Sequence, residues 1–195
     1  QAKNGGYKKL GASLIYYQPD ITRDNIIPNW SFSNYDGWDS NEDEYIVVDK
    51  TLSGGVGMAI TMSSSASLFT ASGTKYNVVS STQYTLCVYA KATGDASAVA
   101  TVNWFDSTGA SVGSPSSSSS TPLSTSIVPV TVTATAPATA KTATVSIVFT
   151  GTDEQVVTVD SVVMNEGAST ITIDDNSPFV IFPQTHTYKT VAMVI

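Results

Sequence analysis

Five carboxylates gather in a short stretch near the start of the chain, and paired carboxylates are one arrangement that could do chemistry. They are Asp36, Asp39, Glu42, Asp43 and Glu44. Two such groups can hydrolyse a glycoside when an apolar pocket raises the pKa of one of them. The residues around this cluster are polar, so the sequence supplies no such pocket. We interpret the cluster as a solvated loop, with a loop-bound calcium as the next interpretation.

Other catalytic constellations are missing from the sequence. The chain has one histidine, His186, and one cysteine, Cys87, which cannot together build a zinc site of histidines and cysteines. A Ser-His-Asp triad would depend on His186, and no Gly-x-Ser-x-Gly motif accompanies it. Cys87 lies in an apolar segment and is expected to be a small buried residue. We therefore expect a protein that is not an enzyme and that has no cofactor.

Aromatic side chains offer a second kind of chemistry, because exposed rings beside polar groups can hold a sugar. The candidate glycan-binding residues are Trp104, Tyr89, Tyr45 and Tyr35. Core packing is the alternative for each of them. Trp104 and Phe105 are neighbours in an alternating segment, so one of the two faces the core and the other faces out. The sequence leaves open which one is exposed.

Composition narrows the class of protein. Charged residues make up 13% of the chain, about half the usual share, while hydrophobic residues make up 42%. A net charge of −7 argues against nucleic-acid binding, which needs a basic surface, and against docking on anionic membranes. No run of about 18 apolar residues exists, so no membrane insertion is expected. A neutral, hydroxyl-rich surface is typical of extracellular β-proteins and of virus structural proteins.

Period-2 alternation with abundant β-branched residues predicts an all-β fold, an antiparallel β-sandwich or jelly roll. In the segments around Val130 and Val145, apolar residues alternate with threonine or serine, which indicates a sheet with one wet face. Pro129 inside such a segment predicts an edge strand or a strand that begins after it. The predicted strands cover residues 45–49, 56–62, 84–91, 98–105, 128–135, 142–149 and 155–164.

The domain organisation follows from changes along the chain. We expect an N-terminal arm over residues 1–24, a β-sandwich over 25–167 and a strand-rich C-terminal extension over 168–195. The serine-rich stretch 114–122 is interpreted as a long flexible loop within the sandwich, since strands continue on both sides of it. The apolar end of the extension either pairs with a neighbouring subunit or continues in a longer protein.

Three motifs resemble those of carbohydrate-binding modules of the family 4 and 9 type, whose fold is a galactose-binding-like β-sandwich. Residues 25–33 read Asn-Ile-Ile-Pro-Asn-Trp-Ser-Phe-Ser and are followed by Gly37-Trp38, which is similar to the opening of such modules. Residues 84–92 resemble a central strand, and residues 157–167 resemble the last strand. The resemblance implies that the opening and closing motifs lie side by side, with Phe32 and Trp38 in the structural core.

The resemblance also bears on metal and function. Members of this type often hold a structural calcium, for which Asp160 matches the late position, but Ser33 stands where the early acidic residue is expected. The same module is frequent in phage tail and fibre proteins.

Two functions follow from these features. The first is a virion structural subunit, such as a bacteriophage head or tail fibre, which contacts copies of itself or other virion proteins and adheres to host surface polysaccharide. The alternative is a glycan-binding module of a secreted or surface carbohydrate-active enzyme. The expected location is the virion, the extracellular space or the cell surface.

Overall fold

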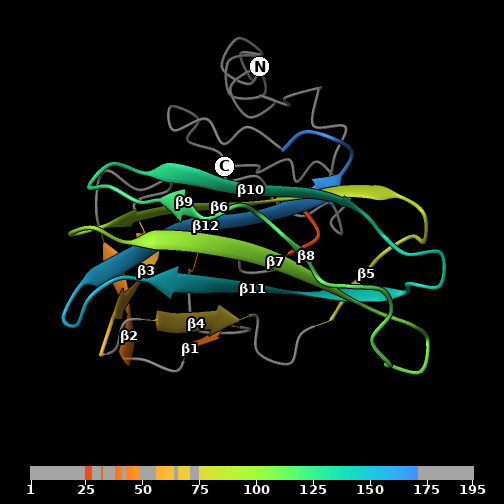
Figure 1. The fold of residues 1–195 in the computed structure, drawn as a ribbon, viewed down its shortest axis with the longest axis horizontal. Helices are drawn as coiled ribbons and strands as arrows, with labels where there is room; N and C mark the ends of the chain where they lie inside the picture. The colour runs from red at the N-terminus through yellow and green to blue at the C-terminus, as the bar shows by residue number, and fades with distance from the viewer. Residues whose placement is uncertain are drawn as a thin grey trace, which may run out of the picture.

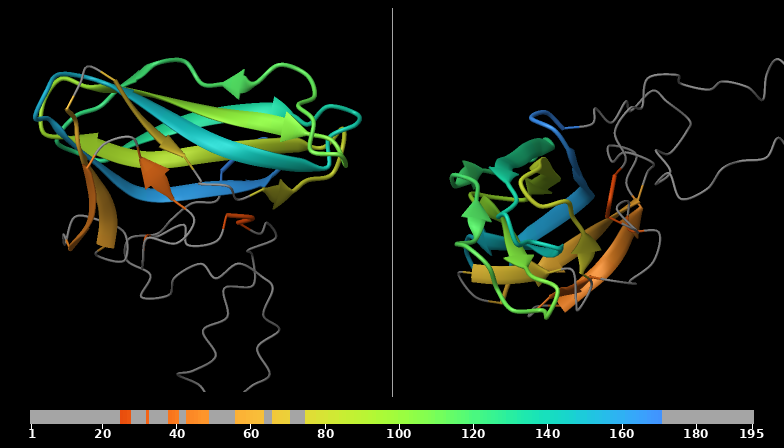
Figure 2. Two further views of the ribbon diagram at one scale, coloured as in Figure 1. Left: turned by 90° about the horizontal axis from the view of Figure 1, so that it is seen from below. Right: turned by 90° about the vertical axis from the view of Figure 1, so that its right-hand side faces the viewer.

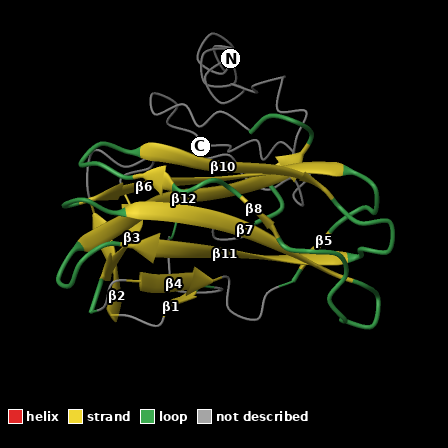
Figure 3. Ribbon diagram, in the orientation of Figure 1, coloured by secondary structure: helices red, strands yellow, loops and turns green. Residues whose placement is uncertain are grey.

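The computed structural model describes residues 25–27, 32, 38–40, 43–48, 56–63, 66–70 and 75–170. Within these ranges every regular element is a strand, and all strand pairs are antiparallel (Figure 3). No helix in this part of the chain combines the length and hydropathy needed to cross a membrane. The proposed arm, residues 1–24, lies outside the described residues, and so do residues 171–195 of the extension.

The strands form two stacked sheets, which confirms the predicted β-sandwich. The long strands of both sheets run along the long axis of the molecule (Figure 1), and the two layers are separate when the molecule is viewed from one end (Figure 2). The seven-stranded sheet contains β1 (Asp39–Ser40), β4 (Ala66–Thr70), β11 (Thr142–Thr150), β7 (Ser97–Phe105) and β8 (Ser116–Ser117), with β5 (Tyr76–Asn77) on β11 and β9 (Thr121–Pro122) on β7. The five-stranded sheet has the order β10 (Val128–Thr135), β6 (Gln83–Ala92), β12 (Val156–Glu166), β3 (Val56–Thr61) and β2 (Asp43–Val48).

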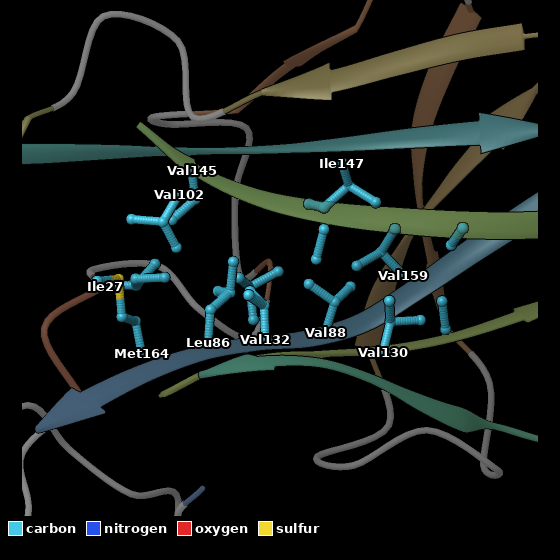
Figure 4. Packing of buried hydrophobic residues seen from close by; sticks show 14 of the residues in the cluster. Ile27, Leu86, Val88, Val102, Val130, Val132, Val145, Ile147, Val159 and Met164 are labelled. Atoms are coloured by element: carbon cyan, nitrogen blue, oxygen red, sulfur yellow. The ribbon is translucent and has the colours of Figure 1, made fainter. Parts of the chain in front are cut away.

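The core lies between the sheets and is built from the alternate apolar residues of the long strands. Leu86, Val88 and Val130 from the five-stranded sheet face Val145 and Ile147 from the other sheet (Figure 4). Each of these side chains is at most 1% exposed. Burial at about 25 cal/mol per Å² of apolar area is the main stabilising contribution to such a fold.

The opening and closing motifs lie side by side, as predicted. The backbone N–H of Ile26 donates to the Met164 carbonyl at 2.9 Å. The Asn25 side chain extends this pairing. Its Oδ1 accepts from the N–H groups of Met164 and Ile27 at 3.0 and 3.1 Å, and its Nδ2 lies 3.4 Å from the Val162 carbonyl. The Asn25 amide thus takes the place of a peptide group beside β12, beyond the point where β3 stops pairing.

The serine-rich stretch pairs with β7 at two places, so it is not the unpaired loop that was expected. Ser116 and Ser117 pair with β7, and Thr121 and Pro122 pair with it again further on. Between these points Ser118 bonds to Ala100 in place of a regular pair of backbone hydrogen bonds. Its N–H donates to the Ala100 carbonyl at 2.8 Å, and its Oγ accepts from the Ala100 N–H at 3.1 Å. Serine hydroxyls can stand in for backbone groups in this way, which a count of serines alone does not reveal.

The five-stranded sheet is buried on both faces along β12, where a one-sided sheet was expected. Residues 157–165 of this strand are all buried. The chain stays in contact with the sheet just after β12. Thr85 Oγ1 donates to the Gly167 carbonyl at 2.7 Å, and Asn165 Nδ2 donates to the Ser169 carbonyl at 3.0 Å. The outer face of the seven-stranded sheet is the more open one, since none of the outward side chains of β7 and β11 is buried.

Candidate functional site

Trp104 lies in the core, so its choice as an exposed sugar platform is corrected. The side chain is 2% exposed and its ring centroid lies 6.1 Å from that of Tyr84 on the facing sheet. Its Nε1 donates to Ser116 Oγ at 3.2 Å, which satisfies the buried indole N–H. Phe105, the next residue, is half-buried and lies on the outer face of the seven-stranded sheet.

The other predicted aromatic residues are not brought together with Trp104. Tyr89 is half-buried on the outer face of β6, where its Cα pairs with that of Pro129. Tyr45 lies on β2, paired with Ala59, and its side chain is outside the described residues. Strands β12 and β3 separate β6 from β2. Tyr35 also lies outside the described residues, so its part in a site stays a prediction.

The acidic cluster divides between the two sheets. Asp39 lies on β1 of the seven-stranded sheet, whereas Asp43 and Glu44 lie on β2 of the five-stranded sheet. Asp36 and Glu42 are outside the described residues. The described backbone therefore contains strand residues where a continuous loop was expected.

Phe32 and Trp38 form an aromatic pair in the core. They are 0% and 5% exposed, and their ring centroids lie 5.4 Å apart with a tilt of 52° between the planes. Tilted pairs at this distance are favourable because the edge of one ring faces the electron-rich face of the other. Phe32 has a φ of 54°, which a non-glycine residue rarely adopts, and its burial holds the backbone in this conformation.

Asp160 is a buried carboxylate, but the described residues give it no acidic partners for a metal. It is 3% exposed and lies where β12 shifts register against β6, between Val159 and Ser161. Calcium sites commonly combine several carboxylates with carbonyl oxygens. Among the described residues no three histidine, cysteine or acidic side chains are grouped so that they could hold a metal ion. The early position of the motif, Ser33, lies outside the described residues, so the calcium site that the resemblance implies stays a prediction.

A different set of side chains gathers at one end of the outer face of the seven-stranded sheet. The Cα register places Asn77 on β5, Thr142 on β11 and Phe105 on β7 in one row across three strands. Two residues further along the same face, Thr144 pairs with Asn103. We call this set the polar corner, and its members are Lys75, Asn77, Asn103, Phe105, Thr142 and Thr144.

The polar corner has hydrogen-bonding groups that the protein itself does not use. Within the described part of the chain, the side chains of Asn77, Asn103, Thr142 and Thr144 make no hydrogen bond. By contrast, Thr101 on the same face is bonded to Ser117 with 2.8 Å between the two hydroxyl oxygens. Amide and hydroxyl groups both donate and accept, which is what the hydroxyls of a sugar require. Asn77 is exposed and the other three side chains are half-buried, so these groups are accessible to a ligand.

An aromatic ring and a single positive charge complete the polar corner. The Lys75 ammonium nitrogen lies 4.2 Å from the centre of the Phe105 ring. Phe105 is fixed in place because its carbonyl accepts from the Lys141 N–H at 2.8 Å. The following turn is also well held, since Asp106 Oδ1 accepts from the N–H of Thr108 at 2.8 Å and from its hydroxyl at 2.6 Å. These bonds hold the pKa of Asp106 below its usual value.

Comparisons with known proteins identify the fold but not a family. No protein-family model and no curated protein sequence matches the chain. Among solved structures, the enzymatically active domain of tailspike protein 4 from bacteriophage CBA120 has a TM-score of 0.60 at 14% identity. The match covers 73% of this chain and 21% of the tailspike chain.

Two further similar structures are described as complexes with oligosaccharides. TmCBM61, solved with β-1,4-galactotriose, has a TM-score of 0.58 at 10% identity, covering 73% of this chain and 99% of its own. The CBM22-1 and GH10 modules of Clostridium thermocellum xylanase 10B, solved with xylohexaose, have a TM-score of 0.54 at 19% identity. That match covers 76% of this chain and 30% of the xylanase chain. The described part of the protein therefore has the fold of a β-sandwich carbohydrate-binding module.

Proposed function

We propose that this protein is a non-enzymatic glycan-binding module that holds its ligand at the polar corner. The observation that carries the proposal is a set of four polar side chains beside the Phe105 ring that make no hydrogen bond among the described residues. An apolar ring face can hold the C–H face of a pyranose while amides and hydroxyls fix its orientation. The similar structures with galactotriose and xylohexaose support this choice of ligand class.

Binding without hydrolysis fits the chemistry of this face. Glycoside hydrolysis needs two carboxyl groups on either side of the scissile bond. The described outward side chains of β5, β7, β8 and β11 include no aspartate or glutamate. This part of the surface supplies hydrogen bonds and an aromatic ring, which orient a sugar but do not protonate a leaving group.

Affinity electrophoresis in gels that contain soluble polysaccharides tests the proposal. We expect the unaltered protein to be retarded by at least one polysaccharide, and Asn103→Ala and Phe105→Ala to lose most of that retardation. Val148→Thr is the matched control, because Val148 is exposed on the same sheet face and lies outside the polar corner. Equal retardation of all four proteins, or no retardation on any polysaccharide, would contradict the proposal. Circular dichroism checks that each variant is folded.

A second candidate function is a structural subunit of a virion, which contacts copies of itself and presents this module to a host polysaccharide. The observation that favours it is the similarity to a bacteriophage tailspike domain. Light scattering on the protein as it occurs naturally tests this role. A defined multimer supports a subunit of an assembly, and a monomer contradicts it. On either function the expected location is a virion or another extracellular surface.

A further inference from the structure

Lys75 contributes the one charged side chain among the described residues of the polar corner. The protein has 16 acidic residues and 9 basic ones, so acidic side chains that could pair with a lysine are in excess. The ammonium nevertheless makes no ion pair with any described residue, and it lies 4.2 Å from the centre of the Phe105 ring. In the described part of the structure, this positive charge therefore has no acidic partner.

The acidic residue of the neighbouring loop, Asp106, makes no ion pair with Lys75. Asp106 follows Phe105 directly, but its Oδ1 is occupied by the N–H and hydroxyl of Thr108 and by the N–H of Ala110 at 3.0 Å. The loop thus keeps this carboxylate in its own turn. Because a cation and an aromatic ring attract only weakly at an exposed site, a carboxylate that hydrogen-bonds the ammonium competes well with the ring.

We propose that the polar corner selects an acidic sugar, which is a uronic acid or another pyranose with a carboxylate group attached to its ring. The inference rests on the proposed glycan binding and names the substrate class of the same site. The Lys75 ammonium moves from the Phe105 ring to form an ion pair with the sugar carboxylate. The exposed ring face then packs against the C–H face of the pyranose. Asn103 and Thr144, paired across β7 and β11, then hydrogen-bond the sugar hydroxyls.

The overall negative charge of the protein sharpens this selectivity. A chain with a net charge of −7 repels a densely charged anionic polymer at long range. One lysine beside neutral amides and hydroxyls therefore suits a glycan with isolated carboxylates between neutral sugars. A close-range ion pair of this kind weakens as salt is added.

Pairs of monosaccharides that differ only in the carboxylate separate its contribution to binding from that of the rest of the sugar. Methyl β-glucoside and methyl β-glucuronide differ in one group, as do the corresponding galactose pair, and NMR titration of the labelled protein measures their binding. We expect at least one uronide to bind about tenfold more tightly than its neutral partner, the usual effect of one hydrogen bond to a charged group. Lys75→Met should remove this preference, Lys75→Arg should keep it, and added salt should reduce it.

Lys91→Met is the matched control, since it removes the same charge from β6 of the other sheet. It should leave the preference for the uronide unchanged. Equal affinity for both members of each pair, or an unchanged preference in Lys75→Met, overturns the inference while glycan binding stands. If no sugar of either kind shifts any resonance of the polar corner, the proposed function itself is overturned.

Discussion

Replacing Asn25 with alanine tests how the first motif is held against the last strand. The side chain is 2% exposed, and its oxygen accepts two backbone N–H groups, those of Ile27 and Met164. Alanine removes the acceptor and leaves both donors buried. Each unsatisfied buried donor costs about 1–3 kcal/mol. The contact of Nδ2 with the Val162 carbonyl, at 3.4 Å, is long and adds little.

We expect Asn25→Ala to lower the free energy of unfolding by about 2–4 kcal/mol, allowing for some water entering the space that the side chain leaves. For a domain of this size the melting temperature falls by on the order of 10 °C. Urea unfolding followed by circular dichroism measures the change, with the slope against urea checked to be the same.

Asn77→Ala is the control for this substitution. It removes the same side chain from an exposed position on β5, where the amide makes no hydrogen bond to a described residue. Its effect should stay within about 0.5 kcal/mol. A loss of less than 0.5 kcal/mol in Asn25→Ala, roughly equal to that in the control, would refute the account of how the two motifs are joined.

Three further predictions follow from the structure. Trp104→Ala should lower the free energy of unfolding by about 3–5 kcal/mol and Phe105→Ala by clearly less, and the reverse order in urea unfolding would contradict the placement of these rings. Burial raises the pKa of the Cys87 thiol above its ordinary value of 9.0, so the stability linked to this group is complete below that value and declines as pH rises above it. Urea unfolding at about pH 7 and about pH 10 should therefore show a smaller alkaline loss for Cys87→Ala than for the unaltered protein, and an equal loss would count against the buried thiol. The melting temperature should be the same in excess calcium and in EDTA, and a clear drop in EDTA that Asp160→Asn abolishes would show that Asp160 helps to hold a structural metal.

Most of the fold could be predicted because alternation alone specifies a strand with one buried face. Every predicted strand segment is present, and Pro129 does lie on β10 at the edge of its sheet. The pairing of the serine-rich stretch with β7 was not predicted, because the stretch has no alternating apolar residues. Ser118 instead bonds Ala100 through its hydroxyl group and its backbone N–H. The two-sided burial of β12 depends on tertiary contacts, which no local pattern reveals.

The candidate site was harder to predict than the fold, although one signal was available. Ala98, Ala100 and Val102 occupy the same face of β7 as Trp104, so the parity of the strand placed the indole in the core. The same alternation places the next residue, Phe105, on the outer face, so it would have identified Phe105 as the candidate for sugar contact. The rest of the polar corner needs the register between β5, β7 and β11, which brings Asn77 and Asn103 together from distant parts of the chain. Sequence spacing does not contain that register.

Mapping a bound oligosaccharide by backbone amide NMR tests the central claim most directly. With a ligand identified by affinity electrophoresis, the account predicts that the largest shifts fall on β5, β7 and β11, at Asn77, Asn103, Phe105, Thr142 and Thr144. Shifts centred instead on β6 and β10 of the five-stranded sheet, around Tyr89, would contradict it.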